Sequence, residues 1–442
     1  MLSLIINNNY NILINVNTGR WLGFYYEANK NNVQLWNINK SKLKQIYEKY
    51  EKLSEILNLY DELEKRLPIR RDLLTKMNYL VLHTSDACNM RCKYCYAEDN
   101  LFNCEANKMP AKVMIDAINK FLIKDDFWVL FHGREPLTNL DAILETVQYF
   151  SGYKTVHFIL QTNGMLLDEK TIKKFQNLNV KINISIDGFD DYANELRINK
   201  HTKNYTAKIT NLLKNNKEIS PILILHKNNI NSISQISDEL KKQNHNFVAY
   251  NFLWPTAENK SLDKYIVDNE TLFKNLVNVF ENGIIETETS SRFAFKERDL
   301  YLLYGRVVYR HINNYMCNKS PCGAGSVCIC VNFNGDVYPC TTVNGQKENY
   351  MGNIYKNTKE EILSSDFVLK HRNLNNIEEC KTCPFKLFCG GGACSGLLYN
   401  YKKNINLKSI YCNYYYNMVL YIMKECINYQ KDDIFLNKGG DS

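Results

Sequence analysis

Residues 76–290 predict an α/β fold in which short buried strands alternate with longer helices. Two observations carry this prediction: apolar runs of strand length recur through the region, and segments with helical spacing of apolar residues separate them. Such alternation is typical of parallel strands joined by crossover helices. The strands are predicted at 79–82, 127–131, 155–160, 180–186, 222–225 and 247–252, and the clearest helices at 111–122, 140–150 and 233–242.

The composition is that of a globular protein with more than one domain. The chain has 442 residues, more than a single core usually serves, so two or three domains are expected. Hydrophobic residues make up 45% and charged residues 23%, and the net charge of +8 is modest for this length. The charge is interpreted as a solvated surface, so no nucleic-acid partner is predicted. No apolar run is long enough to predict a membrane span.

Fifteen cysteines are the most informative feature of the composition. The apolar run at 2–6 is too short for an export signal, and asparagines interrupt it at once. A cysteine-rich chain without such a signal is more often metal-binding than disulfide-linked. A cytoplasmic location is therefore expected, in an oxygen-poor cell if the cysteines hold exposed clusters.

The first 75 residues are predicted to form a small module of strands followed by a helix. Residues 10–16 and 21–26 have strand patterns, and 41–67 carry apolar residues at helical spacing until Pro68 ends the helix. The module is interpreted either as a docking site for a peptide or as a packing extension of the next domain, and both interpretations stay open.

Three cysteines closely follow the first predicted strand of the α/β region. Cys88, Cys92 and Cys95 are separated by three and then two residues. Three close thiolates can hold three irons of a cubane and leave the fourth iron open to a small chelating molecule, whereas four-cysteine motifs close the cluster. The alternative is a structural zinc site, which needs a fourth ligand. The nearby candidates, His83 and Cys104, are not at usual ligand spacing.

With the aromatic Tyr94 before its last cysteine, this motif resembles that of the radical S-adenosylmethionine (SAM) superfamily. The resemblance implies a partial (β/α)6 barrel, a [4Fe–4S] cluster on the three cysteines, and SAM bound to the open iron through its amine and carboxylate. Cleavage of SAM then gives a 5′-deoxyadenosyl radical, chemistry that the cofactor supplies while the protein orients and shields it. In α/β barrels such chemistry lies at the C-terminal ends of the strands.

The segment His-Gly-Arg-Glu-Pro at 132–136, after the second strand, resembles the Gly-Gly-Glu-Pro stretch of the family. The resemblance implies that Gly133 and Glu135 lie at the amine of SAM. Arg134 replaces the second glycine, and glycine serves where backbone must approach closely or take a positive φ, so the loop geometry is in question here. Taken alone, such a short motif is an ordinary turn that caps a helix.

Polar residues at the next two strand ends are further candidates for binding SAM. Gln161 and Asn163 follow the third strand, although Asn-Gly is equally a turn signal. Ser185 and Asp187 resemble the ribose-contacting Ser-x-Asp-Gly of the family. Arg197 follows where related enzymes place an arginine near the SAM carboxylate, a group that a guanidinium binds well; a lone arginine is otherwise a surface ion pair.

The ends of the last two strands carry weaker candidates. His226 follows the fifth strand, and a lone histidine there is interpreted as a packing or solvent-facing residue before it is taken as a contact to SAM or substrate. Residues 251–254, at the end of the sixth strand, are candidates to line the substrate cavity.

From Cys317 onward the sequence becomes a cysteine framework, in which Asn334 and Gly335 predict a two-residue hairpin. Enough thiols are present for two four-thiolate clusters. A pair of zinc ribbons is the alternative, for which the Cys-x-x-Cys pair at 380–383 alone is adequate. The remaining cysteines are treated as core residues or left unassigned: Cys104, Cys328, Cys330 and Cys426.

The order of this framework resembles the SPASM extension of peptide-modifying radical SAM enzymes. All seven SPASM cysteines have counterparts, namely Cys322, Cys340, Cys380, Cys383, Cys389, Cys394 and Cys412. The resemblance implies that Cys322, Cys340 and Cys394 hold a first auxiliary cluster. Cys317 is its natural fourth ligand, and the other four SPASM cysteines hold a second cluster. Four residues instead of three separate Cys389 from Cys394, and the glycines among them are expected to absorb the difference.

These motifs divide the chain into five predicted segments. They are an N-terminal module at 1–75 that is a candidate for leader-peptide docking, a radical SAM core at 76–290, a linker at 291–316, a SPASM domain at 317–428 and a tail at 429–442.

The resemblance implies a radical enzyme that acts on peptides. The favoured prediction is a maturase that forms a thioether between a cysteine and a carbon of a ribosomal precursor peptide, with SAM and three [4Fe–4S] clusters as cofactors and a flavodoxin or ferredoxin as electron donor. The nearest alternative is an anaerobic sulfatase-maturating enzyme that makes formylglycine, for which the N-terminal extension is long. Alternatives from other classes are a non-catalytic iron–sulfur electron carrier and a zinc-ribbon nucleic-acid binder.

Overall fold

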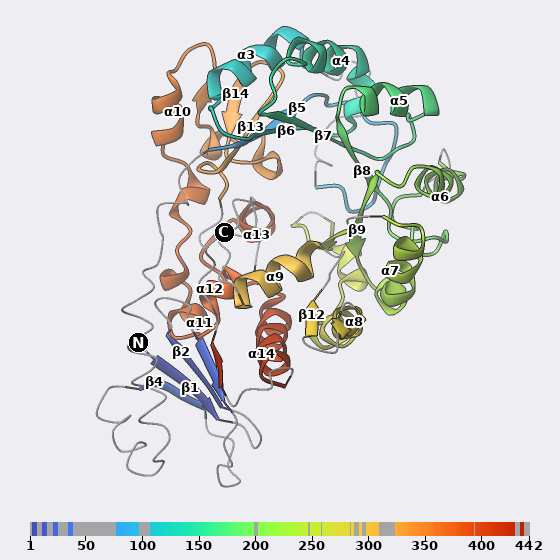
Figure 1. Ribbon diagram of the computed structural model, residues 1–442. Coiled ribbons are helices and arrows are strands. Elements are labelled where there is room, and N and C mark those ends of the chain that lie inside the picture. The colour runs from blue at the N-terminus through green and yellow to red at the C-terminus, as the bar shows by residue number, and fades with distance from the viewer. Residues whose placement is uncertain are drawn as a thin grey trace.

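The structure of the chain is a computed structural model dominated by one nine-stranded sheet, with a separate five-stranded sheet for the N-terminal strands (Figure 1). It describes residues 2–6, 11–15, 21–24, 34–38, 77–96, 107–198, 202–245, 248–257, 259–282, 284–286, 291–293, 298–308, 323–392, 394–428 and 434–436.

Six parallel strands form the larger part of the nine-stranded sheet (Figure 1). They lie in the order β10-β9-β8-β7-β6-β5, so each strand pairs with its neighbour in the sequence, as short crossover connections require. The arrangement confirms the predicted α/β fold. The strands are β5 (Tyr79–His83), β6 (Phe127–His132), β7 (Val156–Thr162), β8 (Lys181–Ser185), β9 (Ser220–Leu225) and β10 (Ala249–Phe252).

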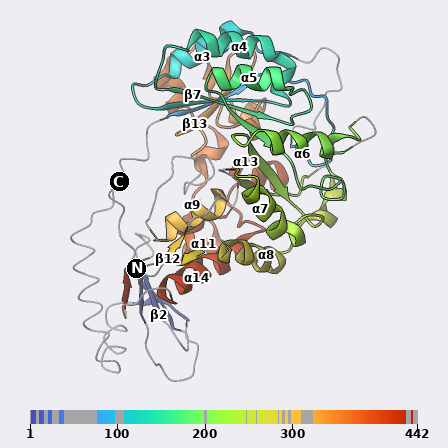
Figure 2. The same cartoon turned by 45° about the vertical axis from the view of Figure 1, so that its right-hand side comes forward.

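Crossover helices cover the outer face of this sheet (Figures 1 and 2). Strand residues such as Leu80 and Val129 pack with helix residues such as Met114 in one apolar core. Because side chains alternate along a strand, Val81 and Leu130 belong to a second cluster on the inner face. The helices are α3 (Ala111–Phe121), α4 (Leu140–Tyr149), α5 (Glu169–Asn177), α6 (Tyr205–Asn215), α7 (Ile233–Lys242) and α8 (Asn269–Glu281).

Local sequence determines where several of these helices begin. The Asp168 carboxylate accepts a hydrogen bond from the backbone N–H of Thr171 (2.7 Å), and Asp268 accepts one from Thr271 (2.8 Å). Each N-cap satisfies a donor that the first helical turn would leave unpaired and places a negative charge at the positive end of the helix dipole.

The cysteine-rich part of the chain is joined to the barrel by strand pairing. β13 (Cys328–Val331) pairs in parallel with β5, and β14 (Asp336–Tyr338) pairs antiparallel with β13. The predicted hairpin at Asn334 and Gly335 is confirmed, with Gly335 at a φ of +85°. β15 (Gly352–Asn353) is the last strand on this side. The cysteine-rich part therefore begins as a continuation of the parallel sheet.

Helices also hold the cysteine-rich part against the barrel. The 17-residue α14 (Cys412–Asn428) packs on α8, and the Asn269 side chain at the start of α8 donates to Ile410 O (2.8 Å) and accepts from Tyr414 N (2.9 Å). Within the described residues, no helix is both long and apolar enough to cross a membrane. The other helices here are α10 (Lys359–Ser364), α11 (Glu378–Lys381), α12 (Lys386–Cys389) and α13 (Ser395–Lys402).

The segment 291–316, predicted to be a linker, contains regular structure. β12 (Ser291–Phe293) pairs with β11 (Ile284–Glu286), and α9 (Arg298–Val308) packs against β10 and α14. The composition of this segment does not carry a strong turn or linker signal, and packing on the end of the barrel sheet stabilises the helix.

The N-terminal strands form a five-stranded antiparallel sheet in the order β16-β3-β2-β1-β4. The Trp21 Nε1–H donates to Val307 O of α9 (2.6 Å), and a Cβ at Gly23 would lie 2.4 Å from the Ile427 side chain of α14. The strands predicted at 10–16 and 21–26 are confirmed, whereas the helix predicted at 41–67 lies outside the described residues. The bounds are β1 (Leu2–Ile6), β2 (Asn11–Asn15), β3 (Trp21–Phe24), β4 (Gln34–Ile38) and β16 (Ile434–Leu436).

β16 was not foreseen within the tail predicted at 429–442, and it gives a first testable prediction. A chain that ends at residue 428 loses the strand that pairs with β3, so the amides of β3 are expected to exchange with solvent about tenfold faster. Hydrogen exchange read by mass spectrometry measures this. A chain that ends at residue 436 retains β16 and is the control; equal exchange in the two chains would contradict the prediction.

Candidate active site

The C-terminal ends of the parallel strands bring four loops together, and these loops carry most of the residues predicted to bind SAM. The loops follow β5, β6, β7 and β8, and backbone hydrogen bonds join them. Arg134 N donates to Ser85 O (3.0 Å), which ties the second loop to the first. Lys93 N donates to Leu196 O (2.7 Å), which ties the first loop to the segment after β8. Backbone hydrogen bonds by themselves therefore connect these loops.

The three cysteines of the first motif lie on the loop after β5 and are partly buried. Met90 N donates to Cys88 Sγ (3.3 Å), and Cys95 N donates to Cys92 O (3.1 Å). Burial raises the pKa of the Cys92 thiol to about 12 and also raises that of Cys88, and the nearby Cys95 adds to both shifts. Crowded, desolvated thiols are protonated in the absence of metal and release protons on ligation. The set fits a cluster held by three thiolates.

Gly133 explains why the loop after β6 accepts an arginine at 134. Gly133 has a φ of +127°, and a Cβ there would lie 2.7 Å from Ser85 O, so only glycine fits. Arg134 does not require a positive φ, and its backbone N–H makes the bond to Ser85 O. The glycine requirement therefore applies to the first position of the motif, and the arginine at the second leaves the contact with the cysteine loop intact.

Gly133→Ala is expected to destabilise the protein, because the added Cβ meets backbone and the φ is strained. The expected loss in the free energy of unfolding is about 2–4 kcal/mol, measured by urea titration. Gly152→Ala is the matched control, since no atom of the described residues lies within 4 Å of a Cβ at that position. A loss no larger for Gly133→Ala than for Gly152→Ala would contradict the prediction.

Glu135 is a fully buried carboxylate that joins two loops. Its Oε1 accepts hydrogen bonds from Thr162 Oγ1 (2.6 Å) and Leu137 N (3.1 Å), and its Oε2 accepts one from Asn163 N (2.8 Å). Burial raises the pKa of Glu135 although these three bonds favour the charged form. The carboxylate thus stabilises the loops after β6 and β7. Its contact with the amine of SAM stays a prediction.

The polar residues at the ends of β7 and β8 differ in what their side chains do. Asn163 Nδ2 donates to Asn89 Oδ1 (2.8 Å) and lies 3.8 Å from Cys88 Sγ, so this amide supports the cysteine loop. Gln161 and Ser185 make no side-chain hydrogen bond to any residue in the described part of the chain. Both are partly buried at strand ends, where a polar ligand would find unused donors and acceptors.

Asp187 and Arg197 form a buried ion pair, with exposed fractions of 0% and 5%. Arg197 Nε donates to Oδ2 (2.9 Å) and Nη2 donates to Oδ1 (3.1 Å). Burial alone would raise the pKa of Asp187, but Arg197 holds it below its ordinary value. Burial also opposes the charge of Arg197, yet Asp187 raises the pKa of the guanidinium. The Tyr94 hydroxyl donates to Asp187 Oδ2 (2.5 Å), so three predicted site residues meet here.

His226 lies next to this ion pair and is fully buried. Its Nδ1 accepts from Asn228 N (3.3 Å), and its Nε2 lies 3.7 Å from Asp187 Oδ2. The packing interpretation of His226 is consistent with this position.

Residues 251–254 are mostly committed to packing. Asn251 is exposed, whereas Trp254 is buried with its ring centroid 5.6 Å from that of Tyr411 in the cysteine-rich part. Of the segment predicted to line a substrate cavity, Asn251 is therefore the residue left facing solvent.

The first auxiliary set is described in part. Cys340 is buried, and its Sγ would lie 3.3 Å from a Cβ at Gly396, two residues after Cys394. The end of the β13–β14 hairpin and the start of α13 therefore lie together, as a cluster shared by Cys340 and Cys394 requires. The other predicted ligands, Cys317 and Cys322, lie outside the described residues.

The four cysteines predicted to hold the second auxiliary cluster lie near one another. Burial raises the pKa of Cys383 to about 11 and that of Cys389 to about 12, and in both cases thiols of the same set, including Cys380 and Cys412, add to the shift. Mutual repulsion of this kind is relieved when thiolates bind a cationic iron centre. The donor set therefore fits a four-thiolate cluster.

The loop between Cys389 and Cys394 absorbs its extra residue as expected. Gly390, Gly391 and Gly392 have φ values of +60°, +82° and +60°, a run of left-handed residues that other side chains rarely adopt.

The geometry also bears on zinc as the alternative metal. Among the described residues, no three Cys, His, Asp or Glu side chains converge closely enough to coordinate a single ion. A structural zinc ion needs four ligands around one centre, whereas the thiolates of a cubane sit at separate corners and stand farther apart.

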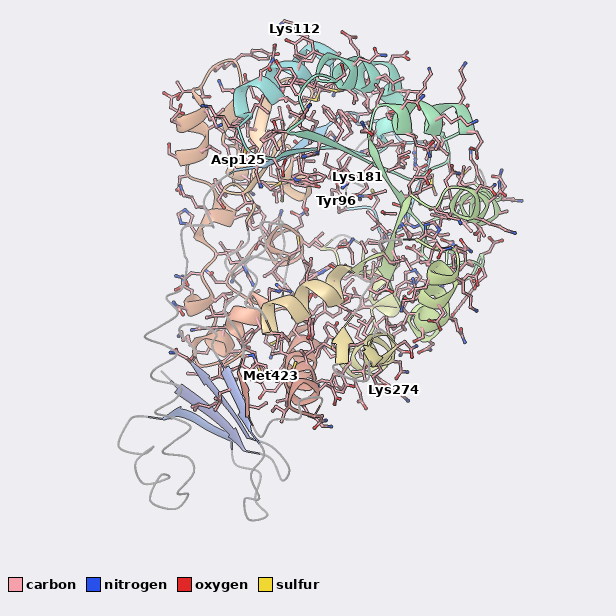
Figure 3. All side chains as sticks on the ribbon, viewed as in Figure 1. Tyr96, Lys112, Asp125, Lys181, Lys274 and Met423 are labelled. Atoms are coloured by element: carbon pink, nitrogen blue, oxygen red, sulfur yellow. The ribbon has the colours of Figure 1, made fainter. Side chains whose placement is uncertain are left out.

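Tyr96 and His132 are site residues that sequence reasoning missed. The Tyr96 hydroxyl lies 3.3 Å from His132 Nδ1 and also bonds the side chain of Thr341, the residue after a predicted auxiliary ligand. Burial lowers the pKa of His132 to about 4, so its ring is neutral at pH 7. Tyr96 lies on the inner side of the sheet (Figure 3). The available signal was adjacency, since Tyr96 follows Cys95 directly.

Comparison with protein families identifies two regions of the chain. Residues 82–240 match the Radical SAM superfamily, and residues 322–384 match SPASM, an iron-sulfur cluster-binding domain. The two matches contain the first cysteine motif and the beginning of the cysteine framework.

The chain is also similar to individual proteins and solved structures. The chain is 25% identical over 362 residues to the cysteine-type anaerobic sulfatase-maturating enzyme of Clostridium novyi, covering 77% of this chain and 93% of that protein. The solved structure of anSMEcpe with bound AdoMet and Kp18Cys peptide matches 79% of this chain and 98% of its own, with a TM-score of 0.63 and 21% identity. The structure of Streptococcus suis SuiB bound to precursor peptide SuiA matches 93% of this chain and 99% of its own, with a TM-score of 0.54 and 15% identity.

Proposed function

Because the chain is a radical SAM protein with a SPASM domain, we propose that it is a peptide maturase that forms a thioether between a cysteine and a carbon atom of a precursor peptide. SAM and [4Fe–4S] clusters, one of them a SPASM auxiliary cluster, are its cofactors, and three clusters are proposed in all. A peptide or protein is its substrate, as it is for the related sulfatase-maturating enzymes. A cytoplasmic location and a flavodoxin or ferredoxin as electron donor belong to the same proposal.

The observation that carries this choice is the N-terminal sheet. The first 75 of 442 residues are about a sixth of the chain, so a match over 93% of it must take in part of this module. The three SuiB structures match 92–93% of the chain, and one of them has a bound precursor peptide. The anSMEcpe structures match about four-fifths of the chain. A module of this kind is suited to hold the leader of a precursor peptide while its core enters the barrel.

The second candidate is oxidation of a cysteine or serine to formylglycine. The sulfatase-maturating enzyme of Clostridium novyi supports it, since its match extends over 93% of that protein. Both reactions remove hydrogen from a substrate carbon and require the same cofactors, so the cysteine positions alone favour neither. The mass change and the chemical reactivity of the product distinguish the two reactions.

The chain's own residues have separable roles in this proposal. Cys88, Cys92 and Cys95 hold the cluster that, when bound with SAM, supplies the deoxyadenosyl radical. Gln161 and Ser185 offer unused polar groups to SAM, because neither is engaged by the described residues. On the inner face of β5 and β6, Val81 and Leu130 pack with Tyr338 of the cysteine-rich part in one apolar cluster, a surface suited to exclude water from a site beside it.

The test is an anaerobic assay of the full chain after reconstitution. Iron and sulfide are counted, and SAM, dithionite and a cysteine-containing peptide encoded beside the gene are added. The expected result is about twelve irons, 5′-deoxyadenosine, and a peptide about two daltons lighter that no longer reacts with iodoacetamide.

Other results separate the candidates. A peptide that loses about 18 daltons from a cysteine, or about two from a serine, and reacts with hydrazines would support formylglycine instead. Zinc in place of iron, without cleavage of SAM, would overturn both candidates.

A further inference from the structure

Asp187 was expected from its motif to contact the ribose of SAM, but its carboxylate is already saturated. Oδ2 accepts from Tyr94 Oη (2.5 Å) and Arg197 Nε (2.9 Å), and Oδ1 accepts from Arg197 Nη2 (3.1 Å) and Ile224 N (2.9 Å). An ionised carboxylate has about four acceptor positions. The side chain is also fully buried, so neither an acceptor position nor an approach is left for a ribose hydroxyl.

The same carboxylate is attached to the loop that holds the first cluster. Tyr94 stands between Cys92 and Cys95, so its bond to Asp187 fixes the part of the loop that carries two of the three thiols. The neighbouring backbone bond from Lys93 N to Leu196 O (2.7 Å) ties this part of the loop to the segment that carries Arg197.

Arg197 keeps one nitrogen for a ligand. Its Nε and Nη2 are taken by Asp187, whereas Nη1 makes no hydrogen bond to any described residue. The guanidinium carbon lies 5.2 Å from the ring centroid of Tyr94, so the tyrosine and the carboxylate together determine the plane of the guanidinium. An oriented guanidinium with one free edge suits an anionic group at the cluster.

We infer that Asp187 is a positioning residue, which locks the cysteine loop through Tyr94, orients Arg197 towards the carboxylate of SAM, and makes no contact with the ribose. Ribose recognition is left to groups with unused polar atoms, of which Ser185 lies two residues earlier. The inference rests on SAM binding by this site and is independent of the peptide reaction. It can therefore fail while the proposed function holds, and the proposed function can fail while the inference holds.

The experiment measures SAM binding to the reconstituted full chain without peptide. Tyr94→Phe, Asp187→Asn and the double variant are compared with Tyr192→Phe, which changes a tyrosine that is 65% exposed and lies between Asp187 and Arg197 in the sequence. Iron is counted, and the affinity is read from the change that SAM causes in the electron paramagnetic resonance spectrum of the reduced cluster. The ligands are SAM and analogues that lack the 2′- or the 3′-hydroxyl.

Tyr94→Phe is expected to keep its iron and to bind SAM about tenfold more weakly, since a hydrogen bond to a charged group is lost. The double variant is expected to bind no more weakly than Asp187→Asn, because both changes break one unit. Removal of a ribose hydroxyl is expected to weaken binding by the same factor in Asp187→Asn as in the wild type.

Two results would overturn the inference. In the first, a deoxy analogue binds the wild type more weakly than SAM does but binds Asp187→Asn as tightly as SAM does. This result would show that Asp187 contacts the ribose. The other, decisive even if Asp187→Asn does not fold, is Tyr94→Phe with the affinity and spectrum of Tyr192→Phe.

Discussion

Cys92→Ser is expected to abolish the formation of 5′-deoxyadenosine. Cys92 is the middle ligand of the three-cysteine loop, and no spare thiol lies on the described part of that loop to replace it. A cluster left with two thiolates does not assemble stably, so the protein is expected to lose about four of about twelve irons. Iron analysis and chromatography of the SAM reaction measure the two effects.

Cys426→Ser is the matched control for this variant. Cys426 is a buried cysteine on α14 to which no cluster is assigned. The change is expected to leave the iron content and SAM cleavage intact while costing about 1–2 kcal/mol of stability, because a hydroxyl replaces a thiol in the core. Full iron content and undiminished SAM cleavage in Cys92→Ser would refute the assignment of the first motif.

Glu135→Ala is expected to cause the largest loss of stability among single changes at the site. The variant leaves three donors without an acceptor, those of Thr162, Leu137 and Asn163, in a place that water does not reach. Each buried unsatisfied donor costs about 1–3 kcal/mol, so a total of about 3–5 kcal/mol is expected after local relaxation. Denaturant unfolding under anaerobic conditions measures the loss.

Glu135→Gln tests the reason for that loss. The amide retains one oxygen for Thr162 but presents an NH2 group to the backbone N–H of Asn163, so an intermediate loss of about 2 kcal/mol is expected. Glu145→Ala on the exposed face of α4 is the control and should change stability by no more than about 0.5 kcal/mol. If Glu135→Ala were as stable as Glu145→Ala, the loop after β7 would not depend on this carboxylate.

The barrel could be predicted from the sequence because its signals are local. The apolar runs at 127–131 and 222–225 have strand length and lie between helical patterns, and the structure has β6 and β9 there. The hairpin at Asn334 and Gly335 follows from a dipeptide that favours positive φ. The first cysteine motif was likewise recognisable, since three thiols in eight residues restrict the chemistry strongly.

The rest depends on contacts between residues distant in the sequence. Pairing of β13 with β5 joins residues about 250 positions apart, and no local pattern specifies it. The role of Asp187 also depends on such contacts. Its motif predicts a contact with a ligand, whereas in the structure its carboxylate accepts hydrogen bonds from Tyr94 and Arg197. Tyr96 follows Cys95 directly in the sequence, but its hydrogen bond to Thr341 in the cysteine-rich part joins residues that are distant in the sequence.

The pairing of β3 with β16 has a consequence for the order in which the protein folds. Phe24 and Ile434 are partners across 410 positions, so synthesis at ordinary rates separates them by about 20–80 s. Hairpins form in about 1–10 μs, and β1, β2 and β3 can therefore pair long before their last partner is made. During translation the edge of β3 is an open template for other chains. The nascent protein is thus most prone to aggregate at its earliest-made sheet, and completion of the chain removes that hazard.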